Sequence, residues 1–211
     1  MARGTFITFE GMDGCGKTTQ LRILASYLRG RGRKVLETVE PGGTDIGQQI
    51  RRILLDPASS AIHARTELLL YFASRAQNVH EVILPALQDG SVVLCDRFTD
   101  STLVYQGCGR GLSSDIVLQL DKVACEGLRP DVTVLLDIDL ETSLARARRR
   151  NERSDGSESR IDDESAHFHE RVRQGYRALA SEQPDRFVVI DGRAGIGEVA
   201  ARIEGALRDR V

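Results

Sequence analysis

The chain has 211 residues, of which 41% are hydrophobic, and this composition predicts one globular domain over residues 1–211 and excludes intrinsic disorder. Its 29 basic and 31 acidic residues leave a net charge of −2, which argues against nucleic acid or an anionic membrane surface as a partner. No apolar run reaches the roughly 20 residues of a membrane span, and no signal peptide is evident, so we expect a cytoplasmic protein with reduced cysteines.

Short β-branched or apolar runs alternate with helical patterns along the sequence. The first run is followed by a helical pattern from about residue 17 to the glycines at positions 30 and 32. A long helical pattern covers residues 69–87, and a closing one covers residues 199–207. The predicted strands are residues 5–9, 34–39, 91–95, 131–136 and 186–190.

The predicted strands are continuously apolar rather than alternating, which is typical of parallel strands covered on both faces. Together with the alternation of strands and helices, they predict an α/β protein with a doubly wound, five-stranded parallel sheet flanked by helices. Ligands of such sheets bind beyond the carboxyl ends of the strands, so the residues that follow each strand are the candidates for function.

The first strand leads into a complete G-x-x-x-x-G-K-[ST] phosphate-binding loop, which predicts a P-loop NTPase fold and a nucleoside triphosphate as ligand. Glycines allow backbone N–H groups to turn toward phosphate oxygens, and the following helix directs its positive end to the same anion. Lys17 is expected to reach the β- and γ-phosphates, and the Thr18 hydroxyl to bind Mg²⁺. The predicted nucleotide-binding residues are Gly11, Met12, Asp13, Gly14, Cys15, Gly16, Lys17, Thr18 and Thr19.

The third strand is followed by Asp96 and Arg97. A carboxylate at this place is expected beside the P-loop Mg²⁺, although a structural ion pair between these two residues is the alternative interpretation. A GTPase is improbable because neither Asn78 nor Asn151 belongs to an Asn-Lys-x-Asp motif that reads guanine. The length fits a small kinase, which needs an acceptor pocket and cations over the transferred phosphoryl group.

Five segments, taken together and in this order, resemble the thymidylate kinase family in its bacterial form; they are residues 9–19, 40–44, 71–75, 96–98 and 105–107. The resemblance extends from about Phe6 to beyond Tyr176. It implies an enzyme of dTTP biosynthesis that uses ATP and Mg²⁺ to convert dTMP to dTDP. It also implies a homodimer, for which the helical region 71–87 is a candidate interface.

The resemblance further implies roles for residues of the phosphate-acceptor site. Arg97 would bind the dTMP phosphate, because a guanidinium fork suits phosphate oxygens, and Arg51 would reach the same region. Asp13 would contact the dTMP sugar. Glu40 would fix this network rather than perform chemistry.

The family's base pocket has an aromatic ring that stacks on thymine and, four residues later, an arginine that hydrogen-bonds a base carbonyl. Tyr71 and Arg75 match this spacing, which places both on one face of a helix; Phe72 is the alternative ring. Thr102 and Gln106 match positions that line the thymine edge, provided that residues 100–106 are helical. Gln106 can both donate to and accept from a base.

Residues 146–162 match the family's mobile lid, which closes over ATP. Gly14 stands where some members carry a catalytic P-loop arginine, so the resemblance implies that the lid supplies this cation. Arg150 and Arg160 are the first candidates, followed by Arg149 and Arg153; a solvated, arginine-rich helix end is the alternative. Two features depart from the family's pattern: Val39 replaces a usual arginine, and the lid looks longer than usual. The expected catalytic residues are thus Lys17, Asp96, Arg97, Arg150 and Arg160.

Two alternative functions stay open at this point. The first keeps the fold and changes the acceptor to another nucleoside monophosphate or a deoxynucleoside. The second is a P-loop switch that binds ATP in order to recruit a partner. Phosphorylation of dTMP distinguishes both from the main expectation.

Overall fold

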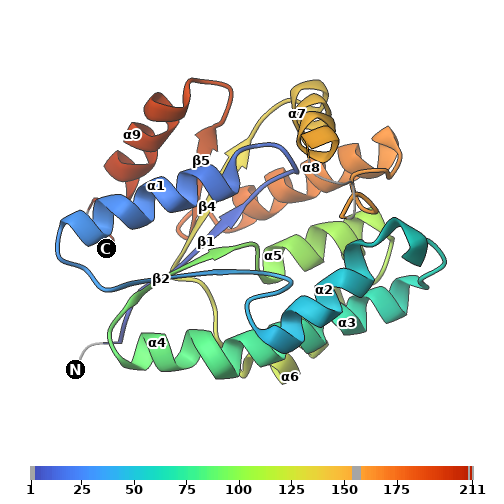
Figure 1. Cartoon of the computed structure of the whole chain (residues 1–211), viewed down its shortest axis with the longest axis horizontal. Helices are drawn as coiled ribbons and strands as arrows, with labels where there is room; N and C mark the ends of the chain where they lie inside the picture. Colours follow the sequence, from blue (N-terminus) through green and yellow to red (C-terminus); the bar gives the residue numbers. More distant parts are fainter. Residues whose placement is uncertain (1–2, 154–157, 209, 211) are drawn as a thin grey trace.

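The computed structural model describes residues 3–153, 158–208 and 210. Its centre is a five-stranded, all-parallel sheet with the order β2-β3-β1-β4-β5 (Figure 1). Each strand begins and ends one residue later than predicted, apart from the end of β2, and the doubly wound fold is confirmed. The strands are β1 (Phe6–Glu10), β2 (Val35–Val39), β3 (Val92–Asp96), β4 (Val132–Asp137) and β5 (Phe187–Asp191).

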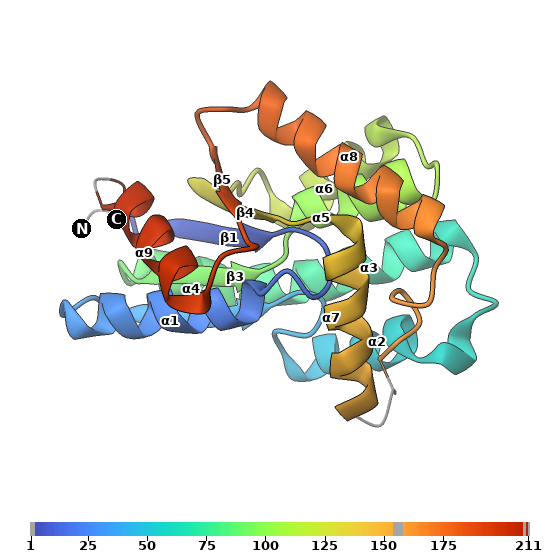
Figure 2. The same ribbon diagram turned by 90° about the horizontal axis from the view of Figure 1, so that it is seen from above.

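Helices cover both faces of the sheet, as Figures 1 and 2 show. One face is covered by α1 and α9, and the other by α3, α4, α6 and α8. The α-helices are α1 (Lys17–Gly30), α2 (Asp45–Leu55), α3 (Ala64–Asn78), α4 (Leu84–Gln88), α5 (Thr99–Thr102), α6 (Ser114–Cys125), α7 (Leu140–Arg153), α8 (Ala166–Glu182) and α9 (Ile196–Leu207). None of the helices that the structure describes is long and apolar enough to cross a membrane.

The long helical pattern of residues 69–87 is confirmed and is part of a longer helical run. α3 continues without a break through the π-helical segment Val79–Ile83 into α4. Residues 100–106, whose helical conformation was the condition for placing Thr102 and Gln106 together, are helical, because α5 continues into the π-helical segment Leu103–Gly109. The predicted lid, residues 146–162, includes residues 154–157, which lie outside the described residues.

The two apolar clusters on opposite faces of the sheet fix the position of β1 at its centre. Ile7 and Phe9 point into the cluster under α1 and α9, whereas Phe6 points into the cluster under α3 and α6. Thr8 packs beside Thr133 of β4, and their hydroxyl groups lie 2.9 Å apart. The end of β1, and therefore the loop that follows it, is held from both faces and from both neighbouring strands.

Glu10, the last residue of β1, is fully buried and ties three elements together. Its carboxylate accepts hydrogen bonds from the Phe98 N–H (2.7 Å), the Ser101 hydroxyl (2.6 Å) and the Tyr176 hydroxyl (2.8 Å). Burial and the nearby charge of Asp100 raise the pKa of Glu10 to about 7, although these hydrogen bonds act in the opposite direction. The end of β1 is thus joined to α5 and α8 by a carboxyl group that changes charge near neutral pH.

The free energy of unfolding is expected to depend on pH because the pKa of Glu10 differs between the folded and the unfolded chain. Between the ordinary value of 4.5 and about 7, the folded chain keeps a proton that the unfolded chain releases, so stability falls as the pH rises. Relative to Glu10→Gln, the wild type is expected to lose roughly 1–3 kcal/mol of unfolding free energy across this range, since one pKa unit equals about 1.4 kcal/mol.

Urea unfolding of the wild type, Glu10→Gln and Glu182→Gln at stepped pH measures this effect. Glu182 is exposed and undergoes the same substitution, so its variant should follow the wild type. A difference between wild type and Glu10→Gln that stays constant from pH 4.5 to 7.5 would contradict the assignment.

Candidate active site

The loop between β1 and α1 has the backbone conformation that its glycines allow. Gly11 and Gly14 have φ angles of 132° and 77°, in the region that other residues rarely adopt. A Cβ atom at Gly11 would lie 2.5 Å from the carbonyl oxygen of Leu136, so β4 approaches a bare backbone here. The buried Lys17 ammonium donates to the carbonyl oxygens of Gly11 (3.0 Å) and Met12 (2.8 Å), which holds it at the loop.

The other residues of the loop divide into core and solvent positions. The side chains of Met12 and Cys15 are buried in apolar clusters, so only their backbone groups are available to a phosphate. Thr18 and Thr19 are exposed at the start of α1. Gly16, the residue before the helix, has a φ of 100° and carries no side chain over the helix N-terminus. The positive end of α1 therefore opens toward solvent, as an anion site requires.

Thr18 and Asp96 are brought together as the sequence predicted. The Thr18 hydroxyl donates to the Asp96 carboxylate at 2.5 Å, where α1 begins and β3 ends. No cluster of three or more metal-binding side chains occurs among the described residues. The two oxygens fit a hard cation that keeps phosphate oxygens and water as its other ligands, which is how Mg²⁺ usually binds.

Arg97, the residue after Asp96, sits in a strained backbone conformation at the centre of the site. Its φ of 72° lies in the left-handed region, which non-glycine residues rarely adopt. The guanidinium donates to the Asp13 carboxylate at 2.7 Å, and to the hydroxyl groups of Ser101 (3.1 Å) and Tyr176 (3.3 Å). The direction of the Arg97 guanidinium is thus set by its own backbone conformation and by side chains of the phosphate-binding loop, α5 and α8.

Asp13 is the counter-charge of Arg97 inside the phosphate-binding loop. Its second carboxylate oxygen accepts a hydrogen bond from the Tyr105 hydroxyl at 2.9 Å. Burial raises the pKa of Asp13, but the positive charges of Arg97 and Lys17 outweigh this effect and hold the pKa below its ordinary range. The carboxylate is therefore ionised at neutral pH and joins the loop to Arg97 and Tyr105.

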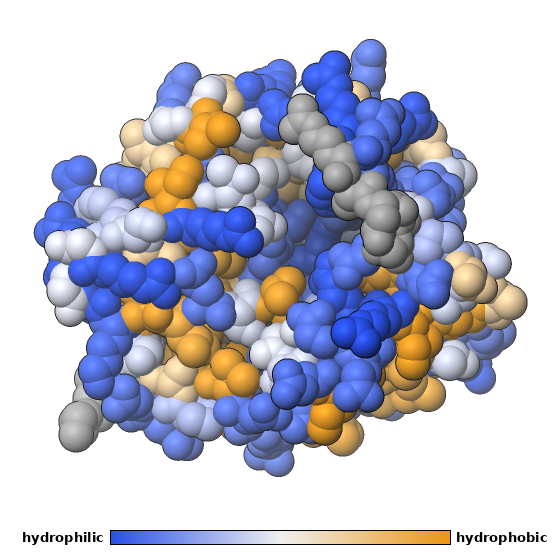
Figure 3. Space-filling view, in the orientation of Figure 1, coloured by the Kyte–Doolittle hydropathy of each residue, from blue (hydrophilic) through white to orange (hydrophobic). Residues whose placement is uncertain are grey.

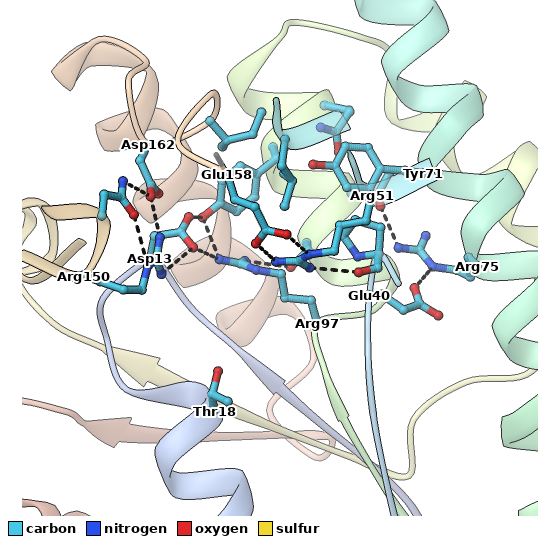
Figure 4. Close-up of a pocket in the computed structure, with 18 residues that line it drawn as sticks. Asp13, Thr18, Glu40, Arg51, Tyr71, Arg75, Arg97, Arg150, Glu158 and Asp162 are labelled. Carbon is cyan, nitrogen blue, oxygen red and sulfur yellow. Dashed lines mark hydrogen bonds and ion pairs between the residues drawn. The ribbon is translucent and has the colours of Figure 1, made fainter. Parts of the chain in front are cut away.

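A cavity of about 380 Å³ runs from the phosphate-binding loop to α3. It lies on the face of the molecule seen in Figure 3, where hydrophilic side chains border a hollow. In Figure 4, Asp13 and Arg150 lie at one end and Tyr71, Arg75 and Glu40 at the other, with Arg97 between them. The predicted site residues that line this cavity are Asp13, Thr18, Glu40, Arg51, Tyr71, Arg75, Arg97, Thr102, Gln106 and Arg150.

Arg75 is fixed at the far end of the cavity by two hydrogen bonds. Its Nε donates to the Glu40 carboxylate at 2.5 Å, and one terminal nitrogen donates to the Thr102 hydroxyl at 2.9 Å. Burial lowers the pKa of Arg75, but the charge of Glu40 outweighs it and raises the pKa, so the side chain stays charged. The other terminal nitrogen, Nη1, is buried and has no hydrogen-bond partner among the described residues.

Tyr71 and Phe72 face different surroundings. Tyr71 lines the cavity, whereas Phe72 is buried in the apolar cluster under α3, 4.9 Å from the Arg75 guanidinium. Burial and the charge of Glu67 raise the pKa of Tyr71 to about 12, so its hydroxyl stays protonated. The ring available to a ligand in the cavity is therefore that of Tyr71.

Arg51 and Arg150 reach the cavity from α2 and α7. Arg51 forms a two-pronged ion pair with Glu158, at 2.8 and 2.6 Å, and donates to the carbonyl oxygen of Pro41. Arg150 pairs with Asp162 at 2.5 Å, and its guanidinium lies 4.0 Å from the Asp13 carboxylate. The structure thus places both arginines beside carboxylates that follow the undescribed residues 154–157.

Arg160 takes a different position from the one expected of a lid cation. Its side chain is only 6% exposed, forms an ion pair with Glu67 at 2.7 Å and donates to the carbonyl oxygen of Leu54. It does not line the cavity. Among the described side chains, Arg150 is the candidate that faces the phosphate-binding loop. Arg149 is exposed, and the side chain of Arg153 lies outside the described part of the chain.

Sequence reasoning missed the polar groups that hold the predicted residues in place. Glu10, Ser101 and Tyr176 surround Arg97 and its partners, and Glu67 holds Arg160. One signal was available, because Glu10 ends a buried strand in the same way as Asp96 does. The other groups come from helices whose packing the sequence pattern does not specify.

The model of the thymidylate kinase family matches residues 9–203 of this chain. A thymidylate kinase of Geobacter sulfurreducens is 54% identical over 209 residues, which are 99% of this chain and 98% of that protein. Another, of Trichlorobacter lovleyi, is 50% identical over 207 residues, which are 98% of each chain. The crystal structure of thymidylate kinase from Ehrlichia chaffeensis matches with a TM-score of 0.79 and 32% identity, covering 98% of this chain and 99% of that one. These similarities confirm the resemblance found in the motifs, and the chain belongs to the thymidylate kinase family.

Proposed function

We propose that the protein transfers the γ-phosphoryl group of ATP to dTMP, forming ADP and dTDP. The observation that carries this proposal is the continuity of one cavity from Thr18, at the phosphate-binding loop, to Tyr71 and Arg75. A kinase for a nucleoside monophosphate needs both sites in one space, because the donor and acceptor phosphates must meet in line. Membership of the family supports the same reaction.

The donor side is built from the loop and the start of α1. Backbone N–H groups of the loop and the Lys17 ammonium would hold the phosphates of ATP. Thr18 and Asp96 would hold Mg²⁺, supported by their contact at the loop. When bound, Mg²⁺ neutralises negative charge that develops on the phosphate oxygens.

The acceptor side is built around Arg97 and the base pocket. Arg97 and Arg51 would bind the dTMP phosphate, and Asp13 would contact the sugar while it keeps Arg97 in position. A phosphate oxygen of dTMP is already ionised near pH 7, so it can attack the γ-phosphorus without a general base on the protein. Catalysis then consists of positioning and electrostatic stabilisation, without a covalent enzyme intermediate.

All four cysteines are free thiols in the structure. Free thiols persist in a reducing compartment, which supports the cytoplasm as the place of this reaction.

A coupled assay with ATP and a panel of acceptors tests the function. dTMP is expected to give the highest kcat/KM among dTMP, dUMP, dCMP, AMP and GMP, and EDTA is expected to abolish turnover if Mg²⁺ is required. ATP binding without phosphorylation of any acceptor would favour a P-loop switch instead. Preference for another acceptor would show that Tyr71, Arg75, Thr102 and Gln106 have been given the wrong ligand.

The catalytic cation can be tested by comparing two arginines. Arg150→Ala is expected to lower kcat by at least about 100-fold and to change the KM for dTMP far less, because arginines that stabilise the transferred group contribute about 10³–10⁵ in rate. Arg160→Ala is expected to have a smaller effect on kcat and to lower stability, since Glu67 loses a buried partner. If Arg160→Ala alone abolished turnover, the role would pass to Arg160, and wild-type turnover in both variants would refute a role for either.

A homodimer is the proposed assembly, supported by exposed apolar side chains on three adjoining helices. α2 packs against α3, and α3 packs against α6. Large apolar side chains exposed on these helices would be buried by a second copy of the chain. They are Ile46, Ile53, Leu69, Ile116, Leu118 and Val123.

Light scattering after size exclusion tests this assembly. The wild type is expected at twice the chain mass of 23.3 kDa, and Leu69→Asp or Val123→Asp at the single mass. Ile196→Asp is the matched control, because Ile196 is equally apolar and exposed but lies on α9. A wild-type mass of one chain at micromolar concentration would contradict the dimer.

A further inference from the structure

Glu67, on α3, is a buried carboxylate that the proposed mechanism does not use. Only 1% of its side chain is exposed, and it collects donors from three parts of the chain. Its Oε1 accepts from the Gln106 amide nitrogen at 2.9 Å and from the Arg110 Nε at 3.1 Å. Its Oε2 accepts from a second Arg110 nitrogen at 3.1 Å and lies 2.7 Å from an Arg160 nitrogen.

These donors keep Glu67 ionised. Burial raises its pKa, but the hydrogen bonds from Arg110 and Gln106 and the charge of Arg110 outweigh this effect and lower the pKa below its ordinary value. An ionised carboxylate only accepts hydrogen bonds. The group that faces Gln106 is therefore an acceptor and cannot act as a donor.

This fixes which end of the Gln106 amide enters the cavity. An amide has a donor end and an acceptor end, and only the NH₂ end can face a carboxylate. The carbonyl oxygen Oε1 must then point the other way. Gln106 lines the cavity, and its Oε1 accepts no hydrogen bond from the described residues. The cavity thus contains a fixed acceptor at this position.

Within the described part of the chain, a donor without a partner belongs to Arg75, which lines the same cavity as Gln106. Arg75 donates to Thr102, which precedes Gln106 by one helical turn, and its buried Nη1 has no partner among the described residues. The described residues that line the cavity therefore include both an unpartnered donor and an unpartnered acceptor. Thymine presents the matching pair, an acceptor at O4 and a donor at N3–H, whereas cytosine presents a donor at its 4-amino group and an acceptor at N3.

We propose that Glu67 is a positioning residue that makes the site select thymine over cytosine, because it fixes the direction of the Gln106 amide. This inference rests on the proposed function. Glu67 touches no substrate, and it acts only through Gln106. Uracil shares O4 and N3–H with thymine, so Glu67 contributes to discrimination against cytosine but not against uracil.

Glu67→Gln tests the proposal because it is expected to turn the Gln106 amide around. Oε2 faces nitrogens of both Arg110 and Arg160, whereas Oε1 faces one guanidinium nitrogen, the Arg110 Nε, besides Gln106. The carbonyl oxygen of the new glutamine is therefore expected at the Oε2 position, where it accepts from both arginines. Its NH₂ would then face Gln106, which must present its own oxygen to that group and its NH₂ to the base. The ratio of kcat/KM for dTMP over dCMP is expected to fall about 10–100-fold, the cost of mispairing one buried hydrogen bond. The dTMP over dUMP ratio should stay within about twofold.

Two further variants separate selectivity from general damage. Arg110→Gln loosens the same cluster but leaves the Glu67 carboxylate facing Gln106, so it should lower stability and keep the dTMP over dCMP ratio. Gln106→Leu removes the amide through which Glu67 acts, so it should also lower the dTMP over dCMP ratio. This result can be measured even if Glu67→Gln does not fold. In the Gln106→Leu background, Glu67→Gln should produce no further change in the ratio.

The possible results are distinguishable. Equal losses for dTMP, dUMP and dCMP in Glu67→Gln, or an unchanged dTMP over dCMP ratio in Gln106→Leu, would overturn the inference. A wild type that does not phosphorylate dTMP at all would overturn the proposed function instead. Binding of dTMP and dCMP measured by calorimetry provides the same comparison without turnover.

Discussion

The ion pair between Arg97 and Asp13 joins the two halves of the site. Asp13 belongs to the loop that follows β1, and Arg97 follows β3, the neighbouring strand. Parallel strands end at the same edge of the sheet, so the two side chains meet without any long excursion of the backbone. The left-handed backbone at Arg97 and the carboxyl of Glu10 hold the same region, so the position of Arg97 relative to the phosphate-binding loop is set by the sheet itself.

The end of the cavity near α3 is organised by buried carboxylates that face arginines and amides. Glu40 holds Arg75, and Glu67 holds Gln106 together with Arg110 and Arg160. Burying such charges costs free energy that their attraction offsets only in part, so these pairs are a weak source of stability. Their effect is geometric: each fixes one donor or acceptor at the cavity wall before a ligand enters, and preorganised groups lose little on binding.

Local patterns in the sequence were sufficient for the sheet and the phosphate-binding loop, whereas the predicted residues at the far end of the cavity came from the resemblance to the family. The strands could be placed within one residue because buried parallel strands are continuously apolar, and Thr18 and Asp96 because strand ends converge. The positions of Glu67 and Arg160 could not be predicted, because they depend on how α3, the Leu103–Gly109 segment and the chain after α7 pack together. An arginine pattern does not reveal whether a guanidinium faces a phosphate or a buried carboxylate, and Arg160 faces the carboxylate.

The central position of β1 has a consequence for how the protein is made. The residues that form the phosphate-binding loop leave the ribosome before both neighbours of β1, which are β3 and β4, with Phe6 paired to Val93 and Ile7 to Val132. Leu136, which packs against the bare backbone of Gly11, emerges later still. A nascent chain that stops short of β4 therefore carries the complete loop sequence without the strand that packs against it, and binding of a nucleotide can stabilise the fold only after β4 has been synthesised.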